Sequence, residues 1–344
     1  MKRILKLTGK IFSFIFLTIL FLFLNIILMF NMFCNGPSLR ARRLFATTLL
    51  ETGQMKFIVN YFIPKEEIIA IVNENSLKEM SSEVDTELIH VNKEDNETFI
   101  KIEKVSGNNF AGTMMIIKDP TKISLATTYP WTEYGKELST LVKENNAIAG
   151  INGGLYASLG NKGGKPLGVA VSNGEILEAD GGYAGLHIIG FDNQNILRII
   201  DISSMGSNDI KKVIQTEGIR DAVAFQEEIS DKNNHFVKLI INGETRELKG
   251  LGSGANPRTA IGQRADGTVL FLVTDGRGAN GHLGATASDL IHVMQKYNAV
   301  NAANIDGGSS SGMYYQDKYL MTSVTLYYSN TSWRLPTAFV VAGE

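Results

Sequence analysis

Residues 302–308 have the sequence AANIDGG, a short run of small apolar residues that ends in Asp306 and two glycines. The same pattern occurs at residues 147–154, AIAGINGG, where Asn152 takes the place of the aspartate. Strands of small residues pack tightly in a core, and each copy would deliver one polar side chain to a strand end beside N–H groups. The repeat predicts a site on a rigid sheet, although two similar turns would give the same pattern.

Segments of strand and helix character alternate around these repeats. Residues 99–105 alternate polar and apolar side chains with a period of two, which is typical of a half-buried strand. Amphipathic helices are expected at residues 137–145 and 286–297, and Thr286 can cap the second. Few helices among many strands predict an α+β domain with mixed β-sheets. Further strands are expected at residues 114–117, 123–126, 186–191, 196–200, 237–241 and 269–274.

The composition is that of a globular protein, with 44% hydrophobic and 20% charged residues among 344. A net charge of −2 gives no electrostatic reason to expect nucleic acid, which requires a concentrated basic surface. The one cysteine, Cys34, excludes an intrachain disulfide and a four-thiolate zinc site. Glycine is abundant, with 34 residues against 7 prolines, and suits tight turns or a backbone that approaches a ligand closely.

The N-terminus predicts a membrane anchor. Basic residues within the first ten positions precede an apolar run over residues 11–33, which is long enough to cross a bilayer as a helix. No small-x-small cleavage site follows this run. We therefore expect an uncleaved single-pass anchor with the remaining chain outside the cytoplasm. A cleaved signal sequence would place the chain on the same side.

Three parts are expected along the chain: residues 1–34 as a basic tip and transmembrane anchor, 35–96 as a membrane-proximal helical segment and linker, and 97–344 as the main domain. Within the second part, residues 38–56 predict one helix and Pro64 marks the start of another. The polar, acidic residues 73–96 predict a linker or a loose helical stalk.

Several segments carry side chains suited to chemistry. They supply two carboxylates, Asp275 and Asp306, and two guanidiniums, Arg258 and Arg277. Arginine side chains match phosphate oxygens with two parallel hydrogen bonds, and N–H groups of glycine loops bind anions. A pair of carboxylates is the usual equipment for cleaving a glycosidic bond. The collection therefore fits a phosphate-bearing sugar better than a plain sugar.

These residues also have simpler structural interpretations. Asp275 precedes a glycine and could form a turn, Arg258 could hold a buried carboxylate, and serines 309–311 could cap a turn. His282 lacks metal-ligand spacing with other histidines or cysteines. No cofactor is indicated with certainty, and a divalent metal on the oxygens of Asp275 or Asp306 stays open.

Four motifs stand in a specific order and spacing: NGGLY at 152–156, PRTAIG at 257–262, DGR at 275–277 and NIDGGSS at 304–310. Together these segments resemble the phosphodiester glycosidase family over about 240 residues, from about residue 99 to 342. Two positions depart from the commoner family pattern: Leu155 stands where phenylalanine is usual, and Ser309 replaces the third glycine of an Asp-Gly-Gly-Gly-Ser run.

The resemblance implies a glycosidase that hydrolyses sugar-1-phosphodiesters, of the N-acetylglucosamine-1-phosphodiester type, in cell-surface polysaccharide or teichoic-acid-type polymers. Asp306 is expected to be the principal catalytic carboxylate, assisted by Asp275 or by a water on Asn152. Arg258 and Arg277 are expected to hold the leaving phosphate. The other substrate-binding residues are expected to be Gly153, Gly154, Tyr156, Asn304, Gly307, Gly308, Ser309 and Ser310.

Two other functions fit the same residues. The chain could be a non-catalytic polysaccharide-binding or export-assisting protein of exopolysaccharide biosynthesis, because a fold does not fix a function. It could also transfer the sugar to a hydroxyl group of a polymer in place of water. The segments alone do not distinguish these functions from hydrolysis.

Overall fold

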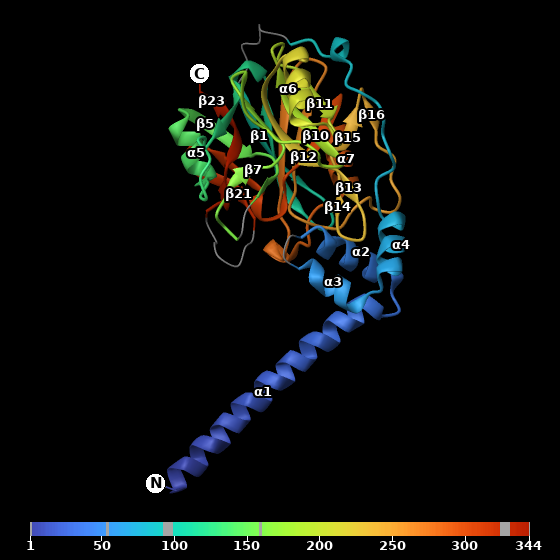
Figure 1. Cartoon of the computed structure of the whole chain (residues 1–344), viewed down its shortest axis with the longest axis vertical. Coiled ribbons are helices and arrows are strands. Elements are labelled where there is room, and N and C mark those ends of the chain that lie inside the picture. Colours follow the sequence, from blue (N-terminus) through green and yellow to red (C-terminus); the bar gives the residue numbers. More distant parts are fainter. Residues whose placement is uncertain (1, 53–54, 92–98, 158–159, 324–330, 344) are drawn as a thin grey trace.

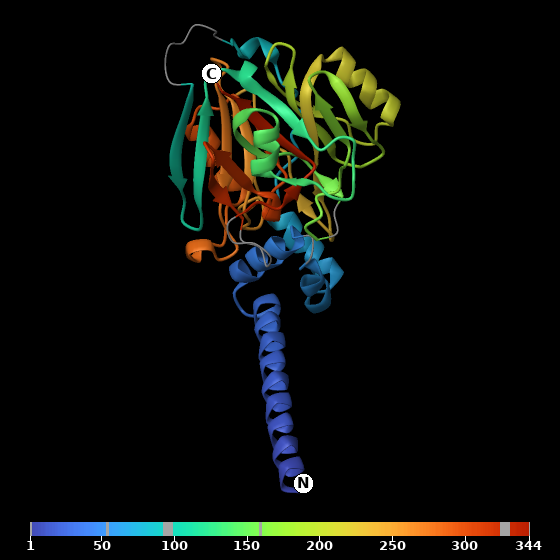
Figure 2. The same ribbon diagram turned by 90° about the vertical axis from the view of Figure 1, so that its left-hand side faces the viewer.

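The computed structural model describes residues 2–52, 55–91, 99–157, 160–323 and 331–343. Three packed sheets form a body that stands on a small group of helices, from which α1 projects (Figures 1 and 2). The expected α+β class and the apolar helix before it are confirmed.

The largest sheet has seven strands in the order β1-β2-β18-β17-β19-β15-β16, and its neighbouring strands pair antiparallel. The strand predicted at residues 99–105 is β1, at the edge of this sheet. The seven strands are β1 (Ile100–Ser106), β2 (Ala111–Ile117), β15 (Lys238–Ile241), β16 (Glu244–Thr245), β17 (Thr259–Gln263), β18 (Val269–Thr274) and β19 (Asn301–Ile305).

Two five-stranded antiparallel sheets complete the body, in the orders β21-β20-β5-β23-β3 and β11-β10-β12-β8-β9. The first consists of β3 (Ile123–Thr127), β5 (Ala147–Asn152), β20 (Gly312–Tyr315), β21 (Lys318–Thr322) and β23 (Thr337–Ala342). The second consists of β8 (Val169–Ser172), β9 (Glu175–Ala179), β10 (Leu186–Asp192), β11 (Leu197–Asp201) and β12 (Ile219–Gln226). Short ribbons pair β4 (Lys136–Glu137) with β22 (Arg334–Leu335), β6 (Tyr156–Ala157) with β7 (Lys165–Pro166), and β13 (Glu228–Ile229) with β14 (Asn234–His235).

The main hydrophobic core lies where the three sheets face one another. Each sheet contributes one ring to its centre, and Phe339 lies 6.1 Å from Phe191 and 6.4 Å from Phe271 between ring centroids. Helices cover the outer faces: α5 (Leu138–Glu144), α6 (Ser207–Thr216) and α7 (Ala287–Lys296). The capping role predicted for Thr286 is confirmed, because its side chain and that of Asp289 bond reciprocally at the start of α7. Helix α6 is absent from the sequence-based expectation.

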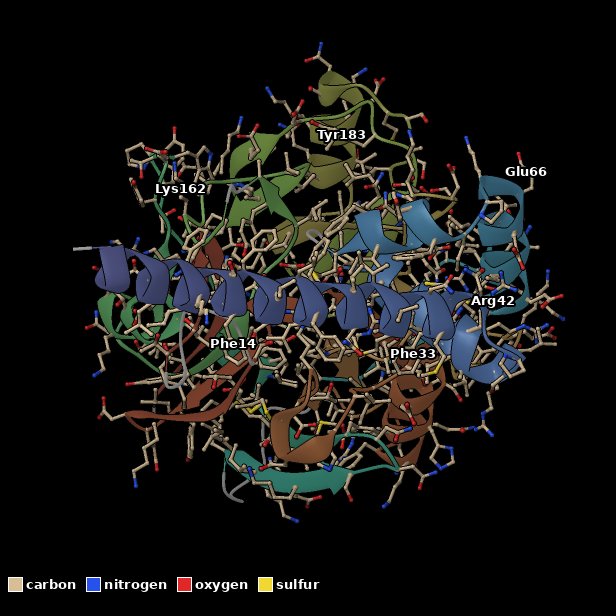
Figure 3. The ribbon with its side chains drawn as sticks, turned by 90° about the horizontal axis from the view of Figure 1, so that it is seen from below. Phe14, Phe33, Arg42, Glu66, Lys162 and Tyr183 are labelled. Atoms are coloured by element: carbon tan, nitrogen blue, oxygen red, sulfur yellow. The ribbon has the colours of Figure 1, made fainter. Side chains whose placement is uncertain are left out.

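The base of the body is built from α1 (Lys2–Asn35), α2 (Leu39–Leu50), α3 (Lys56–Phe62) and α4 (Lys65–Glu74). The end of α1 packs into a small core with the other three helices, whereas most of its described side chains are exposed. In Figure 3, Phe14 lies on the projecting part of α1 and Phe33 lies near the base. The helical span over residues 7–35 is long and apolar enough to cross a membrane.

An extended strap (residues 76–91) joins the base to the sheets. The sequence predicts a linker or loose stalk here, but the strap is packed along the body and includes one short turn, η1 (Thr86–Leu88). Leu77 bridges to Leu248, while Met80 and Val84 pack against the main core. Burial of these scattered apolar residues explains the difference. The three-part division stays a prediction, since its boundary near residue 97 falls outside the described residues.

Candidate active site

The predicted site residues gather where strands of two sheets end. Thr259 at the start of β17 pairs with Ile305 at the end of β19. The next residues along these strands, Arg258 and Asp306, are therefore opposite each other. A neighbouring strand, β18, ends just before Asp275. The register of the seven-stranded sheet thus brings three of the four predicted charged residues to one end.

Asn152 links this end of the large sheet to the end of β5. Its side-chain oxygen accepts hydrogen bonds from Thr259 Oγ1 at 2.7 Å and from the N–H of Gly312 at 3.2 Å. Its amide group donates to the backbone oxygen of Asp306 at 2.7 Å. Because protein groups satisfy this buried amide, the geometry suits a residue that positions Asp306 rather than one that holds a water.

Asp306 is a carboxylic acid whose acidity is matched to neutral pH. Burial raises the pKa of Asp306 to about 7, against the opposing effects of Ser310, the N–H of Gly307 and the charge of Arg277. The N–H of Gly307 donates to its Oδ1 at 3.0 Å. A group that exchanges a proton during a reaction works best with a pKa near the ambient pH. Asp306 therefore has the acidity expected of a catalytic carboxylate.

The second repeat contributes a hydroxyl to the same place. Tyr156 comes shortly after Asn152, and its hydroxyl lies 2.9 Å from Ser310 Oγ. Ser310 in turn hydrogen-bonds to Asp306. Burial and the nearby charge of Asp306 raise the pKa of Tyr156, so its hydroxyl stays protonated. The two sequence repeats are thus joined through a Tyr156–Ser310–Asp306 chain.

Arg277 is held over the turn that follows Asp306. Its Nη1 donates to Ser309 Oγ at 2.7 Å, so the serine that replaces the third glycine of the family pattern gives this arginine a partner. A Cβ on Gly308 would lie 2.7 Å from Arg277 Nη2, and Gly308 has a φ of +61°. The positive φ therefore favours glycine at this position. Arg277 itself has a φ of +55°, a strained conformation of the kind found at functional sites.

The two arginines lie close enough to affect each other. Burial lowers the pKa of Arg277, and the positive charge of Arg258 lowers it further, whereas Asp306 raises it. Converging positive charges favour an anion between or beside them. Arg258 also has an acidic partner: its Nη2 forms a buried ion pair with Glu51, which lies just after α2. This matches the structural alternative that the sequence leaves open for Arg258.

Asp275 orients a histidine that the sequence reasoning sets aside. Its Oδ1 accepts the N–H of Ala111 at 2.7 Å, and its Oδ2 lies 2.7 Å from Nδ1 of His282. This contact leaves Nε2 of the half-buried His282 to accept or donate a proton. The useful sequence signal is the pair of glycines, Gly276 and Gly284, whose backbones bridge and close the loop that returns His282 to Asp275.

Two of the predicted glycine N–H groups bond to the protein backbone. Gly153 donates to the backbone oxygen of Thr337 at 3.0 Å, and Gly308 donates to that of Pro257 at 2.8 Å. A Cβ on Gly154 would lie 2.4 Å from the oxygen of Ala224. The glycines of both repeats therefore permit close backbone packing. The positive charge for an anion comes from the arginine side chains.

The remaining predicted residue, Asn304, lies on β19 and is buried. Its amide donates to the backbone oxygen of Phe236 at 3.0 Å, and its side-chain oxygen has no partner among the described residues. Within the same residues, no group of three His, Cys, Asp or Glu side chains is placed to hold a metal ion. A hollow of about 510 Å³ lies elsewhere, beside the strap, and its lining mixes acidic residues with Arg198 and Lys238.

Comparison with known proteins identifies the family of the chain. The family model for phosphodiester glycosidases matches residues 145–342, more than half of the chain. The chain belongs to the phosphodiester glycosidase family. Asn152, Arg258, Asp275 and Asp306 all fall within the matched residues.

The phosphodiester glycosidase is also similar to individual proteins. The SPbeta prophage-derived uncharacterized protein YomE of Bacillus subtilis is 25% identical over 205 residues, which are 59% of this chain and 29% of that protein. The zebrafish N-acetylglucosamine-1-phosphodiester alpha-N-acetylglucosaminidase catalytic domain, auto-inhibited by its pro-peptide, has a TM-score of 0.51 at 17% identity. That match covers 74% of this chain and 87% of the zebrafish chain. The zebrafish likeness shows the shared fold.

Proposed function

We propose that this chain hydrolyses the bond between the anomeric carbon of a sugar and a phosphate oxygen in sugar-1-phosphodiesters. Asp306 is the principal catalytic carboxylate in this proposal. The observation that carries it is a carboxylate with a pKa near 7, set beside Arg277 and opposite Arg258 at the end of the large sheet. Such a group can act at the sugar while the arginines hold the phosphate.

The expected reaction uses the phosphate as its own leaving group. A water oxygen bonds to the anomeric carbon, the bond from that carbon to the phosphate oxygen breaks, and a phosphate monoester leaves with the electron pair. The proton of the water goes to the ionised carboxylate of Asp306. Positive charge beside the departing oxygen stabilises the transition state. Arg277, which donates a hydrogen bond to Ser309, supplies this charge in our proposal.

The supporting roles follow from the contacts. Asn152 holds the backbone of Asp306, and the hydroxyl chain through Ser310 and Tyr156 fixes its carboxyl group. Asp275 orients His282, which adds a second group able to exchange a proton. The proposed substrate is a phosphate-linked glycan or polymer at the cell surface, because the apolar helix α1 would place the body next to the outer face of a membrane.

The test compares the full chain in detergent with its Asp306→Asn variant. Each protein is incubated with UDP-N-acetylglucosamine and with a nitrophenyl N-acetylglucosamine-1-phosphodiester, with and without a chelator. The zebrafish relative's name makes N-acetylglucosamine the first sugar to try. We expect free sugar from the parent and a rate at least about 100-fold lower from the variant. Full activity in a folded variant would refute the role of Asp306. Tight binding of polymer without any release of sugar would instead support a binding protein.

A further inference from the structure

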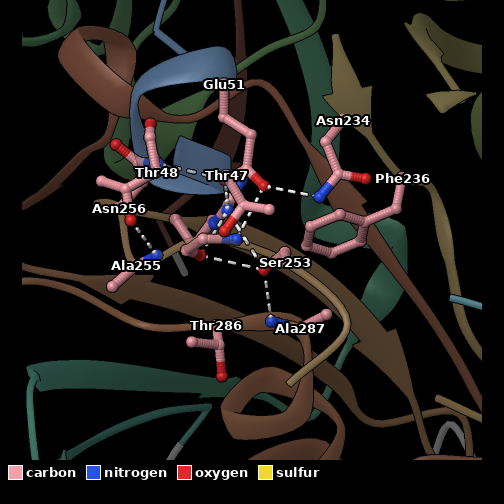
Figure 4. Close-up of polar contacts among 12 residues, drawn as sticks. Thr47, Thr48, Glu51, Asn234, Phe236, Ser253, Ala255, Asn256, Thr286 and Ala287 are labelled. Carbon is pink, nitrogen blue, oxygen red and sulfur yellow. Dashed lines mark hydrogen bonds and ion pairs between the residues drawn. The ribbon is translucent and has the colours of Figure 1, made fainter. Parts of the chain in front are cut away.

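Glu51 is a buried carboxylate that reaches the site region from outside the sheets. It follows the last residue of α2, and its side chain is 1% exposed. Figure 4 shows Glu51 among its polar partners. Four donors of the main body bind its two oxygens: the N–H of Gly254 at 2.7 Å, Asn234 Nδ2 at 3.0 Å, Asn256 Nδ2 at 3.1 Å, and Arg258 Nη2. A carboxylate with this many charge-assisted bonds is fixed in place.

The contacts of Glu51 determine how Arg258 is presented. Nη2 of Arg258 binds Glu51 and the backbone oxygen of Gly254, and the guanidinium stacks on Phe236 with 4.9 Å to the ring centroid. Nε points to the oxygen of Ala285 at 3.4 Å. No hydrogen bond joins Nη1 to a described residue. The guanidinium is thus held along one edge, and its Nη1 stays available for a ligand.

The same contacts reach the turn beside Asp306. Thr48 of α2 accepts the N–H of Ala255 on its hydroxyl at 3.0 Å and the amide of Asn256 on its backbone oxygen at 3.2 Å. The next residue, Pro257, accepts the N–H of Gly308 at 2.8 Å. The end of α2 therefore supports one loop, residues 253–258, that carries Arg258 and contacts the turn after Asp306.

We propose that Glu51 is a positioning residue of the active site, which fixes Arg258 so that Nη1 meets the phosphate of the substrate. The membrane-proximal helices would then be part of the working enzyme and not only a tether. This inference rests on the proposed function, because it assigns the anion at Arg258 to the substrate phosphate.

The contacts of Glu51 fit a residue that stays bound to Arg258 better than one that leaves when the substrate binds. Withdrawal of Glu51 would remove one acceptor from each of four donors and leave the buried charge of Arg258 without its carboxylate, which is costly in a dry site. The backbone contacts of Thr48 would also break. Glu51 is therefore expected to stay in place while the phosphate approaches the other edge of the guanidinium.

The test uses the full chain in detergent with Glu51→Gln and a matched control, Glu227→Gln. Glu227 forms a two-pronged ion pair with Arg246, at 2.6 Å for both bonds, and no hydrogen bond joins either residue to the 253–258 loop among the described residues. Binding of inorganic phosphate is measured by calorimetry, together with kcat and KM for the nitrophenyl phosphodiester and the melting temperature. A misplaced binding group can cost up to about 100-fold.

We expect Glu51→Gln to weaken phosphate binding and to raise KM by about 10-fold or more, with a smaller change in kcat. Glu227→Gln should leave both values unchanged, even where it lowers the melting temperature. If Glu51→Gln does not fold, Asn234→Ala removes one donor to Glu51, keeps the ion pair, and should shift phosphate binding in the same direction. Unchanged phosphate binding, or tighter binding in Glu51→Gln, would overturn the inference. A parent whose phosphate binding depends on Glu51 but that releases no sugar would overturn only the proposed hydrolysis.

Discussion

Replacing Asp306 by asparagine should stabilise the protein at pH 8. Burial raises the pKa of Asp306 to about 7, whereas an aspartate in an unfolded chain has a pKa of about 3.9. The difference is about 3 units, and each unit corresponds to about 1.4 kcal/mol. Ionised Asp306 therefore costs the folded state at most about 4 kcal/mol. Its side chain is only half-buried, so we expect a gain of about 1–4 kcal/mol in the variant.

The sign of the effect defines the pH window. Because the pKa is higher in the folded state, the folded protein binds more protons than the unfolded chain between pH of about 4 and about 7. The cost of ionising Asp306 is thus absent below about pH 4, grows across this range, and is complete above about pH 7. The free energy of unfolding of the parent should fall relative to that of Asp306→Asn over the same window.

The assay is urea unfolding of the full chain in detergent at several pH values, followed by tryptophan fluorescence. Asp266→Asn is the control, because it makes the same chemical change at an exposed turn residue that caps the N–H of Thr268. The difference in free energy of unfolding between Asp266→Asn and the parent should not change with pH in the way expected for Asp306→Asn. A difference between Asp306→Asn and the parent that is equal at pH 5 and pH 8, or a variant less stable at pH 8, would refute the reasoning.

Two further substitutions test the neighbouring contacts. Arg277→Ala should lower kcat/KM for the phosphodiester about 100-fold with little change in melting temperature. Ser309→Gly should lower kcat/KM by a smaller factor. An unchanged rate in Arg277→Ala would show that this arginine takes no part in the reaction. Asn152→Ala should lower the free energy of unfolding by about 2–4 kcal/mol, because it leaves Thr259, Gly312 and the backbone of Asp306 without partners; a loss below about 1 kcal/mol in urea unfolding would contradict its linking role.

The sequence predicted those strands and helices whose pattern of apolar and capping residues is local. The alternation at residues 99–105 gives a strand, and the cap at Thr286 starts a helix. Helix α6 has helical spacing, with Ile210, Val213 and Ile214 packed against the body, but its remaining residues are mostly polar, and the sequence reasoning passed over it. The strap was also difficult, because Leu77 and its apolar neighbours are separated by charged residues that favour a linker.

The site residues stay a prediction from the sequence, and their contacts could not be predicted from it. Asp306 and Arg277 stand next to glycines that mark them in the sequence, and the structure brings them together. Glu51 is 207 positions from Arg258, and nothing local distinguishes it from any other acidic residue at a helix end. The contact of His282 with Asp275 depends on the loop that Gly276 and Gly284 close. Contacts of this kind arise only when distant strands and helices pack.

The most direct test of the central claim is to follow the oxygen of water into the products. The full chain is incubated with the nitrophenyl N-acetylglucosamine-1-phosphodiester in water labelled with heavy oxygen, and the products are separated and weighed by mass spectrometry. We predict that the label enters the free sugar, that nitrophenyl phosphate is unlabelled, and that Asp306→Asn releases neither. Release of sugar-1-phosphate or of labelled phosphate would contradict the account, because the cut would then fall on the other side of the phosphorus.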